Sequence, residues 1–185
     1  MNFPDPGLTQ NIYIPNAIGV RELNLDNDWR GRWVNMDELP EHAPVDYAYA
    51  AVLMGDKGYV TRPRGQAVWG TVEGATGSEA VQAFLKRALK EQMGATIART
   101  EMLGFLECRA TQHNPDVPKD TIRVRPVFLV VAEKVDDIGA ESPYERRRLP
   151  MNEYLKAVRN RYPELAEQFG DAGQRYAVLR AKGEA

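Results

Sequence analysis

Apolar residues recur at helical spacing over residues 78–93, and this segment is the clearest helix that the pattern predicts. Ser78 is expected to cap its start, because a serine hydroxyl can accept from the free N–H groups of a first turn. Glu79 then falls in that turn, where the helix dipole favours a carboxylate. Gly94 is expected to end the helix in a left-handed conformation. The predicted apolar face consists of Val81, Phe84, Leu85, Ala88 and Leu89.

Strands are predicted on both sides of this helix. Residues 45–60 alternate around a Gly-Asp-Lys-Gly turn and read as a hairpin. After the helix, residues 95–110 read as one or two strands broken near Gly104. Residues 121–131 begin with alternation and continue as an apolar run, which is typical of a strand buried on both faces.

Helices are predicted again toward the end of the chain. Residues 151–162 place Leu155, Val158 and Tyr162 on one side. A further piece over 163–169 starts with proline and is expected to stop at Gly170, and residues 171–181 form a last short helix. The order of elements predicts an α/β fold, with helix 78–93 on one face of a mixed sheet and helix 151–162 on the other.

The segment around the first helix carries a recognisable motif. The Nudix box reads Gly, five residues, Glu, seven residues, then Arg-Glu-aliphatic-x-Glu-Glu-x-Gly-aliphatic. The loop and helix resemble this box, with three departures: Glu73 stands at the opening glycine, and Ala88 and Gln92 stand where the family has glutamates. The matching positions are Glu79, Arg87, Leu89, Glu91 and Gly94.

The resemblance implies a Nudix-like α/β/α sandwich around a mixed sheet. It also implies hydrolysis of a diphosphate linked to another group, by water attack with Mg²⁺ or Mn²⁺. Glu91 would be the surviving metal ligand and Arg87 would orient it; these two are the candidate catalytic residues. Glu73 and Glu79 complete the candidate metal set, with Glu79 supporting the loop. Strand carboxylates, either Glu101 or Glu107, are further candidates for a missing ligand.

The departures leave three hypotheses about function open. Ala88, Glu91 and Gln92 would share a helix face, which then carries one carboxylate instead of three. Since Mg²⁺ prefers hard oxygen ligands, usually carboxylates, we favour a protein that binds a nucleoside-diphosphate-type ligand with reduced or lost pyrophosphohydrolase activity. The alternatives are an active hydrolase with an atypical site that uses Mg²⁺ or Mn²⁺, and a structural subunit of an assembly. The expected cofactor is Mg²⁺ or Mn²⁺ if the protein is active, and there is none if activity is lost.

Two pairs of arginines are candidate ligand contacts. Arg62 and Arg64 alternate along a predicted strand, and so do Arg123 and Arg125. Each pair would therefore face one side of its strand. The pairs either bind the phosphates of a nucleotide-type small molecule or lie on a solvated edge.

Composition narrows the class of protein. Hydrophobic residues make up 43% of the 185 residues, enough for a sizeable core. The formal net charge of −2 gives no electrostatic case for nucleic acid as a partner. A membrane span needs roughly 20 consecutive apolar residues, and no run approaches that length. The single cysteine, Cys108, and the lack of a signal-peptide pattern favour a cytoplasmic protein.

The chain divides into three predicted parts. Residues 1–43 form an N-terminal arm with a short strand at 12–14, residues 44–165 form the Nudix-like domain, and residues 166–185 form a C-terminal helical extension. Trp29 and Trp33 lie in a polar stretch of the arm. They either form an interface, which predicts a homodimer with the arm crossing to the partner, or fold back on the chain's own core.

Overall fold

The computed structural model describes residues 22–185, and the strand predicted at 12–14 lies outside them. Eight strands in this part of the chain form one mixed sheet in the order β1-β2-β6-β7-β3-β4-β8, with β5 paired to β3. All neighbouring pairs are antiparallel except β3 and β7, which run parallel. The strands are β1 Glu22–Leu25, β2 Trp29–Val34, β3 Tyr47–Met54, β4 Lys57–Pro63, β5 Val72–Ala75, β6 Ala95–Ala110, β7 Ile122–Val135 and β8 Tyr144–Pro150.

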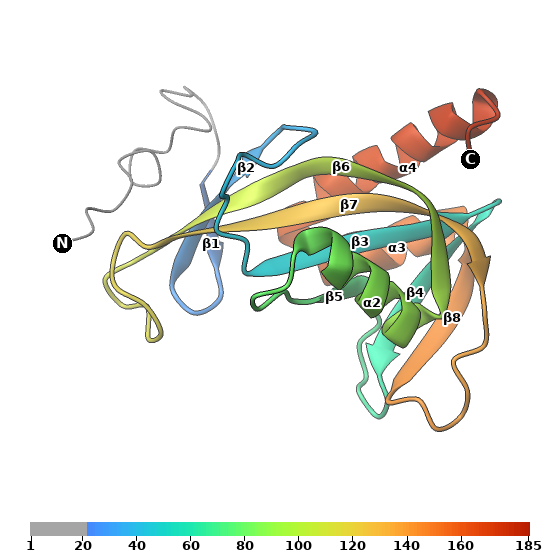
Figure 1. Cartoon of the computed structure of the whole chain (residues 1–185), viewed down its shortest axis with the longest axis horizontal. Helices are drawn as coiled ribbons and strands as arrows, with labels where there is room; N and C mark the ends of the chain where they lie inside the picture. Colours follow the sequence, from blue (N-terminus) through green and yellow to red (C-terminus); the bar gives the residue numbers. More distant parts are fainter. Residues whose placement is uncertain (1–21) are drawn as a thin grey trace.

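Helices cover both faces of this sheet (Figure 1). Helix α2, Val81–Met93, lies on one face. Helices α3, Met151–Arg161, and α4, Ala166–Ala181, lie on the other face and are joined by a 3₁₀ turn at Pro163–Leu165. Each face has its own apolar core, with Phe84, Leu85 and Leu89 buried under α2. The prediction of a mixed sheet between helices 78–93 and 151–162, with residues 121–131 inside the sheet, is confirmed.

The start of α2 differs from the prediction. The helix begins at Val81, its N-cap position is Ala80, and no side chain caps it. Ser78 and Glu79 belong instead to the turn before the helix, where the Glu79 N–H donates to the Thr76 carbonyl at 3.0 Å. Glu79 therefore lies just before the helix and not in its first turn, and its carboxylate binds Arg87. The predicted end is confirmed, because Gly94 has φ 70° and its N–H donates to the carbonyls of Leu89 and Lys90.

Gly94 gives the first testable prediction of stability. A Cβ at this position would lie 2.3 Å from the carbonyl oxygen of Asp136, and its φ of +70° is costly for other residues. Gly94→Ala should therefore lower the free energy of unfolding by about 1–3 kcal/mol, measured by urea titration. Gly139→Ala is the matched control, since its φ is +77° with nothing within 4 Å. Equal losses in the two variants would contradict a role for the close approach to Asp136.

The C-terminal helix runs without the predicted interruption. Gly170 does not end a helix, and α4 continues through it to Ala181. The burial of Phe169, Tyr176 and other residues of one α4 face holds this segment together. At Gly173 a Cβ would lie 2.9 Å from Leu155, so the glycine allows α4 to approach α3 closely.

Strands β6 and β8 also differ from the sequence analysis. β6 does not break at Gly104; it continues across a bulge between Met102 and Gly104, where the Gly104 φ of 142° fits only glycine easily. The charged stretch ending in three arginines forms β8, the edge strand beside β4. Its successive arginines lie on opposite faces of the sheet, so the stretch shows no alternation of apolar and polar residues that would predict a strand.

The part of the predicted arm that the structure describes joins the sheet. β1 and β2 form a hairpin, and β2 pairs with β6. Trp29 is 7% exposed within the core on the α3 side, and Trp33 packs against that core. This arrangement favours the interpretation that both tryptophans fold back on their own chain. No helix within residues 22–185 is long and apolar enough to cross a membrane.

Candidate functional site

A salt-bridge network joins three residues of the motif on the exposed side of α2. The Arg87 Nη2 atom lies 2.7 Å from a Glu79 carboxylate oxygen, and its Nη1 atom lies 3.0 Å from Glu91, one helical turn away. The guanidinium lowers the pKa of Glu79 by hydrogen bonding. Arg87 thus binds both carboxylates and ties the loop to the helix.

The two departures from the motif that lie within the helix, Ala88 and Gln92, point inward. Ala88 is 1% exposed and belongs to the core between α2 and the sheet. Gln92 is 8% exposed, and its amide forms two hydrogen bonds with the backbone of Glu73. Its Nε2 donates to the Glu73 carbonyl at 2.8 Å, and its Oε1 accepts from the Glu73 N–H at 3.3 Å. The neutral amide therefore connects α2 directly to β5.

Beside this contact lies a pocket of about 190 Å³, hereafter the Glu73 pocket. It opens between β4 with its following loop, β5, and the C-terminal end of α3. Glu91 and Glu79 do not line it, whereas Glu73 does. Its wall includes Tyr47, Arg62, Thr71, Glu73, Arg161 and Tyr162.

The Glu73 carboxyl is the acidic group in the wall of this pocket. Burial raises its pKa, while the hydroxyls of Tyr162 and Tyr47 and the positive charge of Arg161 act in the opposite direction. An Arg161 nitrogen lies 3.9 Å from a Glu73 carboxylate oxygen. In turn, burial and the Glu73 charge raise the pKa of Tyr47 to about 12, so this phenol keeps its proton.

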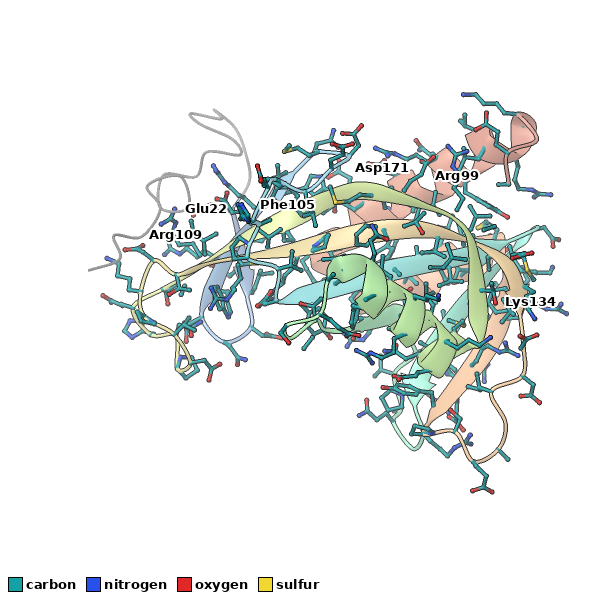
Figure 2. All side chains as sticks on the ribbon, viewed as in Figure 1. Glu22, Arg99, Phe105, Arg109, Lys134 and Asp171 are labelled. Atoms are coloured by element: carbon teal, nitrogen blue, oxygen red, sulfur yellow. The ribbon has the colours of Figure 1, made fainter. Side chains whose placement is uncertain are left out.

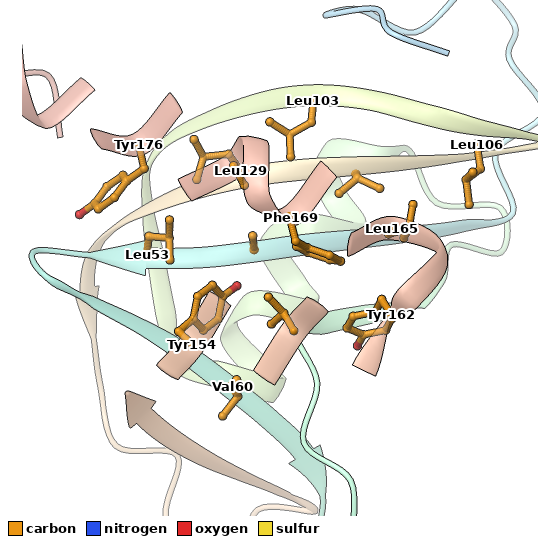
Figure 3. Packing of buried hydrophobic residues seen from close by; sticks show 14 of the residues in the cluster. Leu53, Val60, Leu103, Leu106, Leu129, Tyr154, Tyr162, Leu165, Phe169 and Tyr176 are labelled. Atoms are coloured by element: carbon orange, nitrogen blue, oxygen red, sulfur yellow. The ribbon is translucent and has the colours of Figure 1, made fainter. Parts of the chain in front are cut away.

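Tyr162 forms the floor of the pocket just beyond the end of α3. Its hydroxyl accepts the Thr71 N–H at 3.0 Å, and its ring centroid lies 5.3 Å from that of Phe169. The close-up of the core shows both rings among the buried residues (Figure 3). A Cβ at Gly70 would lie 2.4 Å from the same hydroxyl. The phenol is therefore held in position by the main chain before β5, and a glycine makes room for it.

The two arginines of the first predicted pair both contact one acidic residue, Glu145. Arg62 Nε donates to Glu145 at 2.8 Å, and Arg64 lies 3.4 Å from the same carboxylate. Only Arg62 of the pair lines the pocket. Its guanidinium carbon is 4.2 Å from the centroid of the Trp69 ring, which Arg147 approaches at 4.8 Å.

The second arginine pair lies away from the pocket on β7. Arg125 donates to both carboxylate oxygens of Asp46, at 3.1 and 3.2 Å, and its guanidinium lies 5.4 Å from the Trp29 ring. Arg123 donates to the carbonyl of Ile122 at 2.9 Å. Neither side chain lines the Glu73 pocket.

Three further residues discussed from the sequence, Cys108, Glu107 and Glu101, do not line the Glu73 pocket. Burial raises the pKa of Cys108 to about 12, so its thiol is a core group. Glu107 is paired with Arg32 at 3.1 Å within the sheet. Glu101 binds Arg99 at 2.6 Å, and Arg99 also contacts Glu184 at 2.8 Å. Arg99 lies beside α4 (Figure 2).

The acidic side chains of the described residues are not gathered into one cluster. Nowhere in residues 22–185 do three His, Cys, Asp or Glu side chains come together as a metal-binding group. Glu91 is bound to Arg87, Gln92 to the Glu73 backbone, and Ala88 has no donor. Mg²⁺ is usually held by one or two carboxylates together with substrate phosphates, and on α2 Glu91 is the one residue left to supply a carboxylate.

Several residues of the pocket escaped the sequence analysis. Tyr47 and Tyr162 appeared there only as part of a strand and of a helix face, and Arg161 carried no signal. Their common feature is spatial: β3, β5 and the end of α3 meet at this place, although they are far apart along the chain. The spacing of residues within any one element gives no indication of this meeting.

Comparisons with known proteins identify the fold. No protein-family model matches the chain, and no curated protein matches it. Among solved structures, a mutant of the Bacillus subtilis pyrophosphohydrolase BsRppH is similar with a TM-score of 0.53 and 16% identity, over 70% of this chain and 77% of that one. At this identity the likeness shows the fold alone, which is the Nudix fold.

Two further solved structures are similar at a lower level. The Nudix domain of Shewanella oneidensis NrtR, in complex with ADP ribose, has a TM-score of 0.49 at 16% identity, over 70% of this chain and 88% of that one. Tm1382, a putative Nudix hydrolase, has a TM-score of 0.41 at 17% identity, over 62% of this chain and 60% of that one. Both also belong to the Nudix group of structures.

Proposed function

We propose that this chain binds a nucleoside-diphosphate-type ligand and has reduced or lost metal-dependent pyrophosphohydrolase activity. The observation that carries the proposal is the bridge between the Gln92 amide and the backbone of Glu73, at 2.8 and 3.3 Å. Where the motif of the family has a carboxylate, this chain has a side chain whose donor and acceptor are both used inside the protein. At the other position, Ala88 is buried and forms part of the apolar core under α2.

The charges around the pocket favour an anionic ligand. Arg62 lines it from one side and Arg161 from the other, and Arg161 is 42% exposed. Guanidinium groups bind phosphates through two parallel hydrogen bonds, which suits a diphosphate. In this proposal these two arginines take the role of charge neutralisation that a cation has in a metal-dependent site.

The two alternatives stay open as further proposals. An active hydrolase is favoured by the intact network of Arg87 with Glu79 and Glu91, which holds Glu91 in a fixed orientation. Mg²⁺ or Mn²⁺ would then be its cofactor. A structural subunit or a homodimer would need a surface other than the buried Trp29, and light scattering measures that association directly.

Calorimetric titration with ADP tests the binding proposal. We expect ADP to bind equally well in Mg²⁺ and in excess chelator, because no cation takes part. Arg62→Gln should weaken binding about tenfold or more, since a hydrogen bond to a charged group contributes roughly 1.5–3 kcal/mol. Arg64→Gln is the matched control, because Arg64 shares Glu145 with Arg62 but does not line the pocket. Binding that requires Mg²⁺ would contradict the proposal.

A further inference from the structure

The wall of the Glu73 pocket combines cationic groups with one acidic acceptor. Arg62 and Arg161 suit an anion, but the Glu73 carboxylate would repel it. A pocket for phosphate alone gains nothing from this carboxylate. The arrangement suits a ligand that presents a hydrogen-bond donor next to its anionic group.

The structure holds the Glu73 carboxyl in place and leaves it accessible. Its backbone is fixed by Gln92, and the Tyr162 hydroxyl beside it is fixed by the N–H of Thr71. The side chain is nevertheless 25% exposed. An ionised carboxylate has about four acceptor positions, and the hydroxyls of Tyr47 and Tyr162 use no more than two of them. Glu73 can therefore accept from a ligand without breaking its existing contacts.

We propose that Glu73 is the specificity-determining residue of this pocket and accepts hydrogen bonds from the ribose hydroxyls of the bound nucleotide. The proposal rests on the proposed function and names the part of the ligand that the pocket selects. The phosphate next to the sugar lies between Arg62 and Arg161. Glu73 acts as a direct acceptor in this role, and no metal is involved.

The size and rim of the pocket agree with this placement. A volume of about 190 Å³ is smaller than the roughly 300–1,000 Å³ of sites that enclose a drug-sized molecule, so only part of a nucleotide fits inside. At the mouth, Val68 is 58% exposed, and Tyr144 also contributes to the lining. These two side chains offer apolar surface to the base, which remains outside the pocket.

A pair of probes that differ only in the ribose hydroxyls tests the inference. ADP should bind about tenfold or more tightly than 2′,3′-dideoxy-ADP, because the analogue leaves a charged acceptor without its donor. In Glu73→Met, which keeps the length but removes the acceptor, the two affinities should become equal. The dideoxy analogue should bind this variant at least as well as it binds the wild type, since a like charge is gone. Glu73→Gln provides a second variant and should reduce the preference.

The controls separate this inference from the proposed function. Glu164→Met removes a nearby carboxylate that does not line the pocket, so it should keep the full preference for ADP. Equal binding of both probes to the wild type, or an unchanged preference in Glu73→Met, overturns the role of Glu73 while the proposed function stands. If neither probe binds the wild type, the proposed function and this inference fail together.

Discussion

Hydrolysis of nucleoside diphosphate derivatives in Mg²⁺ is expected to be at least about 10²–10³-fold slower than in an enzyme with a complete metal site. A dication neutralises charge that develops on the phosphate in the transition state, and loss of one such stabiliser typically costs ~3–4 kcal/mol. Ala88 has no ligand atom, and Gln92 uses both of its polar atoms in bonds to Glu73. Losses within one cluster need not add, so the estimate is a lower limit on the defect.

The rate of product formation tests this prediction on three substrate classes: nucleoside diphosphate sugars, dinucleoside polyphosphates and nucleoside triphosphates. Glu91→Gln tests whether any residual rate depends on the one carboxylate that the helix retains, and Glu153→Gln on the exposed side of α3 is its matched control. A normal rate in the wild type that disappears in Glu91→Gln would contradict the prediction. An atypical metal site that includes Glu91 would then replace it.

The structure also changes how activity could be restored. Replacing both Ala88 and Gln92 with glutamate would rebuild the motif, but Ala88 is 1% exposed in the core under α2. A carboxylate there would be buried without a partner, which costs several kcal/mol unless it is neutralised. Failure of that double variant would therefore report on folding as much as on chemistry, and Gln92 is the more informative single position.

The sequence predicts the parts of this fold that depend on local periodicity. The apolar spacing of α2, the left-handed position of Gly94 and the apolar run of β7 each follow from rules that act within one element. β8 was not predicted, because its arginines are held by contacts with residues far away in the sequence. Arg146, for example, donates to the carbonyl of Met93 at 3.0 Å. The continuity of α4 through Gly170 likewise comes from burial against the sheet, which outweighs the low helix propensity of glycine.

The candidate site was predictable only in part for the same reason. Arg87 contacts Glu79 and Glu91, which lie in the preceding turn and one helical turn away, so this network is local in sequence. Spacing along the motif gave no sign that Gln92 would bind the backbone of Glu73, or that Tyr162 would reach Thr71 across 91 positions of the chain. Those contacts depend on how α2, β5 and α3 pack around the sheet.

Gln92→Glu is expected to destabilise the folded protein at neutral pH. The Nε2 donor that now binds the Glu73 carbonyl at 2.8 Å becomes an oxygen, so two acceptors face each other in a site where Gln92 is only 8% exposed. An unsatisfied buried group costs about 1–3 kcal/mol. For a chain of this size each kcal/mol lowers the melting temperature by about 2–4 °C, which differential scanning calorimetry resolves.

The pH dependence of this loss identifies its cause. Burial beside a carbonyl raises the folded-state pKa of the new carboxyl above its unfolded value of about 4.3. The protonated acid can donate to the Glu73 carbonyl, so the variant should approach wild-type stability below that pH and lose stability as pH rises through the folded pKa. Gln92→Leu removes the same bonds without a charge and should show a loss that does not vary in this way. Gln82→Glu, exposed near the start of the same helix, controls for added negative charge.

The effect of Mn²⁺ on the melting temperature of Gln92→Glu tests whether this position can hold a metal. If the new carboxylate and the Glu73 carbonyl together attract a cation, Mn²⁺ should raise the melting temperature of Gln92→Glu and leave that of the wild type unchanged, since binding to the folded state alone stabilises it. That result would show that replacing the Gln92 amide with a carboxylate is enough to create a cation site in this chain. Stabilisation of the wild type by Mn²⁺ would contradict the proposed metal-independent pocket. Full stability of Gln92→Glu at neutral pH in chelator would show that the amide bridge does not hold α2 against β5.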